Sequence, residues 1–199
     1  YYQNILKEVY RDIQKNAFYQ NVWDINKNLY DASLARYRQR RLELGSVNDP
    51  ILEAARLEVA YFAVALEILV PTNNQVNKNE TTGLKDFNKF NEMEADAFSF
   101  SLPSYLEDYV LREVENIRAA KGEMKSPVLL YPKNYDDFVV PADYKYNAKL
   151  NNFYLAMKWM NSNFPLYYKT EDCPDCLLDK NDWLVNLIAA NFITKDLYD

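Results

Sequence analysis

Two cysteines form the most reactive pair of side chains in the sequence. Cys173 and Cys176 stand in the run Cys-Pro-Asp-Cys, and the 199-residue chain has no other cysteine. Three chemistries use this spacing: a redox dithiol, half of a four-thiolate metal site, and a disulfide that closes a short loop. A thioredoxin-like centre needs a strand–helix context, and a metal site needs two more ligands. We therefore favour a disulfide, with the redox and metal alternatives left open.

Carboxylates offer a second chemistry. Asp136, Asp137 and Asp143 are candidates for a carboxylate-dependent hydrolase, because glycoside hydrolysis uses two carboxyl groups roughly 5 to 9.5 Å apart. They fall in a segment without a regular pattern, which is weak support for a shared site. Glu58 and Glu67 lie nine residues apart on one expected helix, and about 100° per residue places them on opposite faces. These two glutamates are therefore not a catalytic pair.

The sequence gives little support for a metal site or for histidine-dependent catalysis. Glu92, Glu94 and Asp96 could bind a hard cation, but they lack the glycine turn and ordered spacing of a calcium loop. The chain has no histidine, which excludes Ser-His-Asp catalysis and a histidine-ligated zinc site within these residues. The sequon Asn79-Glu80-Thr81 lies in an asparagine-rich stretch, where a chance match is unremarkable. We expect no cofactor, no metal and no catalytic constellation.

The composition predicts the kind of fold that positions these residues. Hydrophobic residues make up 49% of the chain, and only three glycines and eight prolines are present. This composition favours a globular protein made of helices over one made of strands, which needs frequent turns. The net charge of −6 disfavours nucleic acid as a partner. The most apolar stretch, residues 57–70, is too short to span a membrane and contains a glutamate at each end.

We predict an all-α fold, a packed multi-helix array with long irregular connections. Residues 1–199 form one helical domain or a fragment of a larger helical protein, since the chain has neither an initiator methionine nor a signal peptide. A break is expected between Gln20 and Asn28. The expected parts are N-terminal helices over 1–45, central helices over 50–122, an irregular aromatic segment over 123–146 and C-terminal helices over 147–199.

Several helix ends have local signals. Asp49 and Pro50 predict the start of a helix that is apolar almost all round and therefore central. Ser104 and Glu107 predict a capping box, and Asn147 predicts an N-cap. A basic run precedes Gly45, and we expect it to face the negative end of a helix dipole rather than to bind anions. That run consists of Arg36, Arg38, Arg40 and Arg41.

Aromatic residues give the candidate binding surface. The chain has 17 tyrosines and three tryptophans, residue types that are common in recognition surfaces. The helix predicted over 147–161 has a face of apolar residues at helical spacing, including Phe153 and Met157, which we expect to pack in the core. The residues proposed to line a ligand-binding groove are Tyr131, Tyr135, Tyr144, Tyr146 and Trp159.

Several short runs, in this order and spacing, carry a resemblance. They are AYFAVA at 60–65, ENIRAAKG at 115–122, KSPV at 125–128 and FYLAMKWM at 153–160. Over about residues 52–164 the chain resembles the bacterial family of domain of unknown function 3160, found in large exported or lipid-anchored envelope proteins. The resemblance implies a helical fold and a cell-surface setting, without an established activity. Where the family pattern has Arg-Gly-His between the equivalents of Pro141 and Tyr144, this chain has Ala142-Asp143, so any catalytic role of that run is lost here.

These observations favour an exported or cell-surface structural or interaction protein, located outside the cell or in the cell envelope. Its expected partners are other proteins or surface glycans. We expect no membrane span in this chain, and a lipid anchor in the full-length protein is compatible with the resemblance. The alternatives are a glycan- or peptide-binding module with a tyrosine-lined groove and, third, the carboxylate-dependent hydrolase.

Overall fold

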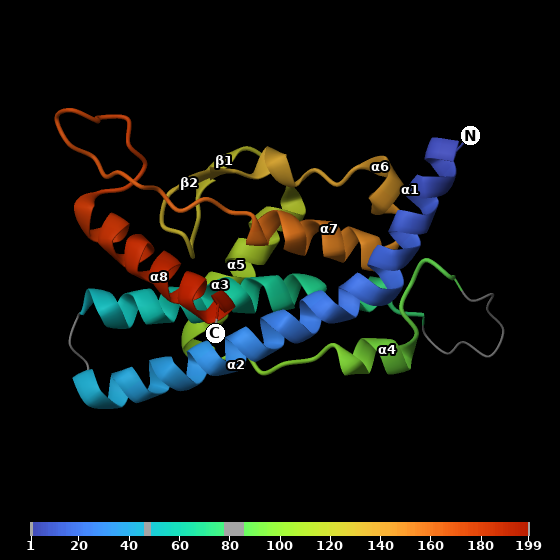
Figure 1. Cartoon of the computed structure of the whole chain (residues 1–199), viewed down its shortest axis with the longest axis horizontal. Helices are drawn as coiled ribbons and strands as arrows, with labels where there is room; N and C mark the ends of the chain where they lie inside the picture. The colour runs from blue at the N-terminus through green and yellow to red at the C-terminus, as the bar shows by residue number, and fades with distance from the viewer. Residues whose placement is uncertain (1, 46–48, 78–85, 199) are drawn as a thin grey trace.

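The fold is described by a computed structural model that covers residues 2–45, 49–77 and 86–198 (Figure 1). It is predominantly helical, as predicted, and the exception among the described residues is a two-stranded antiparallel hairpin. The sequon at 79–81 lies outside the described residues. The elements are α1 (Tyr2–Ile13), η1 (Gln14–Phe18), α2 (Tyr19–Leu44), α3 (Pro50–Leu69), η2 (Asn73–Gln75), α4 (Glu92–Ala97), α5 (Ser104–Ala119), β1 (Glu123–Lys125), β2 (Pro132–Asn134), η3 (Tyr135–Phe138), α6 (Ala142–Lys145), α7 (Ala148–Met160) and α8 (Lys180–Tyr198).

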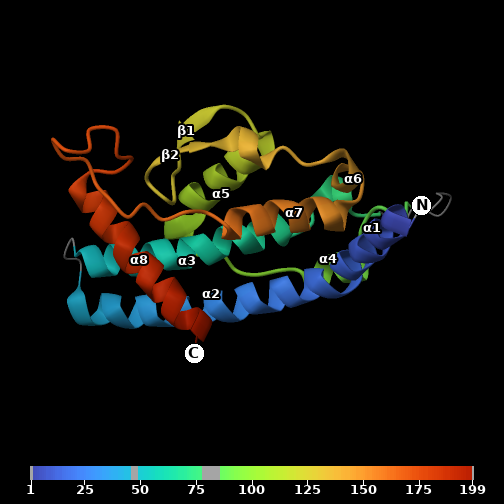
Figure 2. The same ribbon diagram turned by 45° about the horizontal axis from the view of Figure 1, so that its top comes forward.

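Helix α3 is the centre of the molecule. It lies between α2 on one side and α5 and α7 on the other, and α8 crosses it obliquely (Figures 1 and 2). Its start agrees with the prediction, because the Asp49 side chain accepts a hydrogen bond from the backbone N–H of Ile51 at 2.7 Å and Pro50 is the first helical residue. Nearly every residue from Ala54 to Leu69 is buried, which requires the all-round apolar sequence.

The break in the N-terminal helices lies earlier than predicted. The expected interval was residues 20–28, but the chain passes through the π-helical turn η1 at Gln14–Phe18, and α2 then runs without interruption to Leu44. A π-turn shifts the helical register without ending the helix, so no glycine or proline marks it. The apolar stripe of α1, which includes Ile5 and Val9, is consequently exposed, whereas burial begins at Tyr19.

The starts of α5 and α7 test the cap predictions. Helix α5 begins at Ser104, but Pro103 occupies the cap position and no side-chain cap bond forms, so the predicted capping box is wrong. In α7 the Asn147 side chain accepts a hydrogen bond from the backbone N–H of Leu150 at 3.1 Å, as predicted. Phe153 is buried, but Met157 is 41% exposed, because only one side of α7 packs on α3.

None of the described helices is long and apolar enough to cross a membrane.

Candidate functional site

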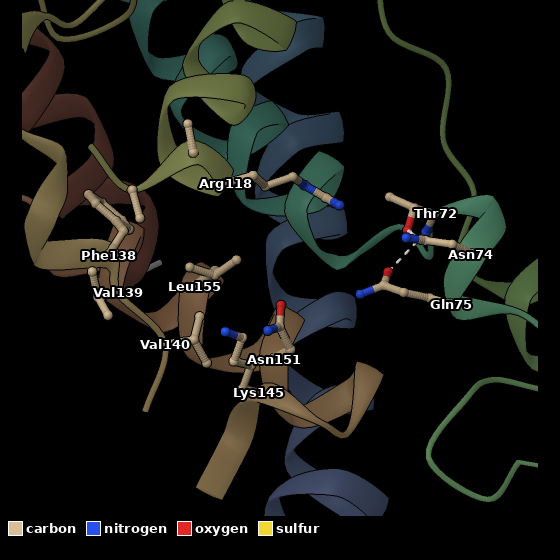
Figure 3. A pocket seen from close by; sticks show the side chains of 12 residues that line it. Thr72, Asn74, Gln75, Arg118, Phe138, Val139, Val140, Lys145, Asn151 and Leu155 are labelled. Carbon is tan, nitrogen blue, oxygen red and sulfur yellow. Dashed lines mark hydrogen bonds between the residues drawn. The ribbon is translucent and has the colours of Figure 1, made fainter. Parts of the chain in front are cut away.

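A pocket of about 400 Å³ opens where the C-terminal ends of α3 and α5 meet α7 (Figure 3). Helix α5 ends at Ala120, whose φ of 48° is in the left-handed region, so the chain turns away sharply there. That turn leaves the last residues of α5 along one edge of the pocket. The lining residues are Thr72, Asn74, Gln75, Arg118, Ala119, Ala120, Phe138, Val139, Val140, Lys145, Asn151 and Leu155.

Arg118 is the most polar group of this pocket. Its Nη2 donates to the carbonyl oxygens of Glu67 and Ile68, at 3.4 Å each, while its buried Nε has no hydrogen-bond partner among the described residues. Burial lowers the pKa of Arg118, and the nearby Glu67 opposes this shift, but a guanidinium remains protonated in proteins. The pocket therefore holds a partly desolvated cation with an unused donor.

The side of the pocket facing Arg118 is polar and fixed. In Figure 3 the Arg118 side chain points toward Thr72, Asn74 and Gln75. Gln75 exchanges two hydrogen bonds with Asn152, at 2.8 and 3.1 Å, and its Oε1 also accepts from the backbone N–H of Thr72 at 3.0 Å. These bonds hold the residues in one orientation, so their remaining donors and acceptors are presented to a ligand without further ordering.

The rest of the lining combines an apolar wall with a second cation. Phe138, Val139, Val140 and Leu155 supply carbon surface, and Lys145 from α6 supplies an exposed ammonium group (Figure 3). None of the described residues that line this pocket is acidic. A pocket with two cations, amide groups and an apolar wall is suited to a small anionic molecule with a carbon skeleton.

The five predicted aromatic site residues are not gathered in one groove. Tyr131 and Trp159 come together, since their rings lie 6.0 and 5.5 Å from Nζ of Lys133. The remaining three lie elsewhere: Tyr135 is fully buried with its hydroxyl 2.7 Å from Oε1 of Glu113, Tyr144 donates to Gln14 at 2.8 Å, and Tyr146 is 78% exposed.

The three candidate aspartates are also dispersed. Asp136 accepts a hydrogen bond from the backbone N–H of Gly122 at 2.9 Å, which fixes the turn after α5. Asp143 pairs with Arg11 of α1. Asp137 lines the cleft that contains Lys133, and Asp143 lines a different cleft beside α1. These aspartates therefore do not form a pair across a common substrate site.

Glu58 has a partner that sequence reasoning missed. Arg36 of α2 contacts Oε1 of Glu58 at 3.2 Å and also pairs with Asp196 of α8. Burial raises the pKa of Glu58 to about 8, the negative charge of Asp196 adds to this shift, and Arg36 opposes it. Arg36 is therefore a link between helices, which differs from the helix-dipole role predicted for the basic run. Glu67 lies apart, near Arg118.

The two remaining candidate motifs are the acidic residues near the start of α4 and the cysteine pair. Glu94 accepts from the backbone N–H of Asn91 at 3.1 Å and pairs with Lys149 at 2.8 Å, so it serves the start of α4. The described residues contain no group of three acidic, cysteine or histidine side chains able to hold a metal ion. Cys173 and Cys176 are joined by a disulfide in the loop before α8.

The sequence contained a weak signal for Arg118. The residue lies in the run ENIRAAKG, one turn before the glycine that follows α5, where a cation commonly faces helix carbonyl groups. That signal identifies a helix end and not a pocket. The opposing residues come from segments distant in sequence, which no local pattern connects.

Comparison with known proteins returns one family. A family model described as "Protein of unknown function (DUF3160)" matches residues 1–195. The match therefore extends beyond the resemblance seen over about 52–164 to nearly the whole chain. Neither the curated proteins nor the solved structures include a significant match.

Proposed function

We propose that this chain, which belongs to the DUF3160 family, is a binding module that takes a small carboxylate-bearing ligand in the Arg118 pocket. The observation that carries this proposal is the guanidinium of Arg118, which lines the pocket and whose hydrogen bonds within the described residues go to two backbone carbonyl oxygens. These bonds are long, at 3.4 Å each, so the group keeps the capacity to bind an anionic oxygen of a ligand. A guanidinium binds a carboxylate through two parallel N–H groups, which suits this chemistry.

The other lining residues define the rest of the ligand. Lys145 supplies a second positive charge at the mouth, and Asn74 and Asn151 supply amide groups able to bond hydroxyl or peptide groups. Val140 and Leu155 offer an apolar surface to a sugar ring or short side chain. A volume of about 400 Å³ suits a ligand the size of an acidic monosaccharide. These features support an acidic sugar as the proposed glycan partner.

We place this module in an exported or cell-envelope protein, as an interaction component. The disulfide between Cys173 and Cys176 supports that setting, because disulfides persist in oxidising compartments. The resemblance to envelope proteins points the same way. Within this setting, an acidic sugar or the acidic end of a peptide at a surface would be the natural ligand.

The test is a titration of galacturonate, with galactose as the uncharged counterpart, followed by isothermal calorimetry. We expect saturable binding of galacturonate, no measurable binding of galactose, and at least a tenfold loss of affinity in Arg118→Met. Arg112→Met is the matched control, because Arg112 lies on the same helix but is exposed and pairs with Asp108. Equal binding of both sugars, or unchanged binding in Arg118→Met, would contradict the proposal. Binding of inorganic phosphate in preference to galacturonate would also contradict the carboxylate assignment.

A further inference from the structure

A second cleft, also of about 400 Å³, lies between β2 and the chain that follows α7. Lys133 from β2 and Ser162, two residues beyond the end of α7, both line it. The Nζ atom of Lys133 lies 2.8 Å from Oγ of Ser162. A hydroxyl and an amine at this distance can exchange a proton directly.

The surroundings of Lys133 are unusual for a lysine. Its Nζ lies 5.4 Å from the ring centre of Phe138, and the rings of Tyr131 and Trp159 lie within 6.0 Å. It forms no ion pair with a carboxylate among the described residues. The amine is thus held against aromatic carbon and bonded to a single hydroxyl group.

Burial and nearby charged groups act on the protonation of Lys133. Burial lowers the pKa of Lys133 and Lys158 lowers it further, whereas the negative charges of Glu113 and Asp137 oppose the shift. The net direction is downward. A larger fraction of Lys133 is therefore neutral near neutral pH than for an exposed lysine, and a neutral amine can act as a base.

We propose that Ser162 and Lys133 form a serine–lysine pair that hydrolyses small acyl esters. Such a pair needs no histidine, so the absence of histidine from the chain does not exclude it. The cleft has room for a small acyl group, and the side chains of Asn134, Asn161 and Asn163 line it together with the pair. Amide N–H groups are suitable donors to the oxyanion of a tetrahedral intermediate. This cleft shares Phe138 with the Arg118 pocket but none of its charged or polar lining residues, and the proposal does not depend on binding there.

The reaction balances without a cofactor. Neutral Lys133 removes the proton from Oγ of Ser162 as the oxygen attacks the ester carbonyl, which forms a tetrahedral oxyanion. The intermediate collapses, the bond to the alcohol oxygen breaks, and Lys133 returns the proton to the departing alcohol. Water then attacks the acyl-serine ester with Lys133 again as base. The carboxylic acid leaves, and Ser162 regains its proton.

The test uses the whole chain with p-nitrophenyl acetate as substrate and a fluorophosphonate probe to locate the nucleophile. We expect release of p-nitrophenolate above the rate of heat-denatured protein and one adduct per chain on Ser162. Turnover should be lost in Ser162→Ala and fall at least 100-fold in Lys133→Arg. Arginine retains a cation near the rings but cannot accept the proton. Lys125→Met is the matched control, since Lys125 is an exposed lysine on the other strand of the same hairpin, and it should keep turnover within twofold.

The pH profile gives a second, independent readout on the unaltered protein. The labelling rate of Ser162 should rise with pH and level off at a midpoint below that of an ordinary lysine. This measurement decides the proposal even if the Lys133 variant fails to fold. Absence of turnover, labelling at another residue, or turnover that persists in Ser162→Ala or in folded Lys133→Arg would overturn the proposal.

Discussion

Two arginines contact the central helix α3, and they bind different kinds of group there. Arg36 of α2 lies between the carboxyl groups of Glu58 from α3 and Asp196 from α8. Arg118 donates to backbone carbonyl oxygens at the C-terminal end of α3, at 3.4 Å, lies near Glu67, and has a buried Nε without a partner among the described residues. The first arginine bridges two carboxyl groups, whereas the second forms no ion pair within the described part of the chain.

This difference separates a structural ion pair from an open binding group. Around Arg36 the carboxyl side chains are 1% and 5% exposed, so the cation bridges two groups that would otherwise be buried without a partner. Arg118 instead lines a pocket of about 400 Å³ that has room for an anionic ligand beside the guanidinium. We therefore expect substitution of the first arginine to affect stability and substitution of the second to affect binding.

The largest expected effect is that of Arg36→Met. The variant leaves the buried carboxyl group of Asp196 without a cation and removes the donor to Glu58, and the free energy of unfolding should fall by about 2–3 kcal/mol. This is below the full cost of breaking a buried ion pair, because Arg36 is 40% exposed and solvent screens part of the interaction. Urea denaturation at pH 7 measures the change.

The matched control is Arg38→Met, two residues along the same helix, with an exposed side chain. It should change the free energy of unfolding by less than about 0.5 kcal/mol. Equal losses in both variants would mean that Arg36 has no special role, and the comparison between the two arginines would then fail.

The sequence predicted α3 and could not predict its partners. The cap at Asp49, the proline that follows it and the all-round apolar pattern are local signals, and each acts within a few residues. By contrast, Arg36 and Asp196 are 160 residues apart. Their contact depends on how α8 crosses the core, which periodicity within either helix does not specify. The basic run was accordingly interpreted as a helix end.

The second prediction concerns the pH dependence of this cluster. The pKa of Glu58 is raised to about 8 in the folded chain, mainly by burial and also by Asp196, with Arg36 and Arg40 opposing. Between pH 5 and 8 the folded state therefore keeps a proton that the unfolded state has lost. The free energy of unfolding should fall as pH rises through this interval, by on the order of 2 kcal/mol, and level off above it.

Glu58→Gln tests this directly, because glutamine resembles the protonated carboxyl group at every pH. The variant should match the unaltered protein at pH 5 and exceed it in stability at pH 8. Glu53→Gln, on the same helix but with its carboxylate 38% exposed beside Arg56, should leave the pH dependence unchanged. A flat profile in the unaltered protein would show that Glu58 remains ionised in the folded state.

Local sequence patterns also fail to predict the two candidate sites, because each site combines residues that are distant in the sequence. Lys133 and Ser162 are 29 residues apart, on a strand edge and after a helix, and neither residue type is conspicuous in the sequence. The hairpin that carries Lys133 has three-residue strands, too short for an alternating pattern to emerge, and it was predicted as irregular. Tyr131 and Trp159 were proposed for ligand binding, and their rings border this lysine.

The smallest expected effect on stability is that of Arg118→Met. Methionine fills a similar volume, removes the buried unpartnered Nε and loses only two long hydrogen bonds. The free energy of unfolding should therefore change by less than about 1 kcal/mol. Galacturonate at 100 times its dissociation constant should stabilise the unaltered protein by about 2.7 kcal/mol. This increment should persist in Arg36→Met and fall to about 1.4 kcal/mol or less in Arg118→Met, as a tenfold or greater loss of affinity requires. If Arg118→Met instead lowers the free energy of unfolding as much as Arg36→Met does, both arginines have a structural role. The proposal that the Arg118 pocket binds a ligand would then be contradicted.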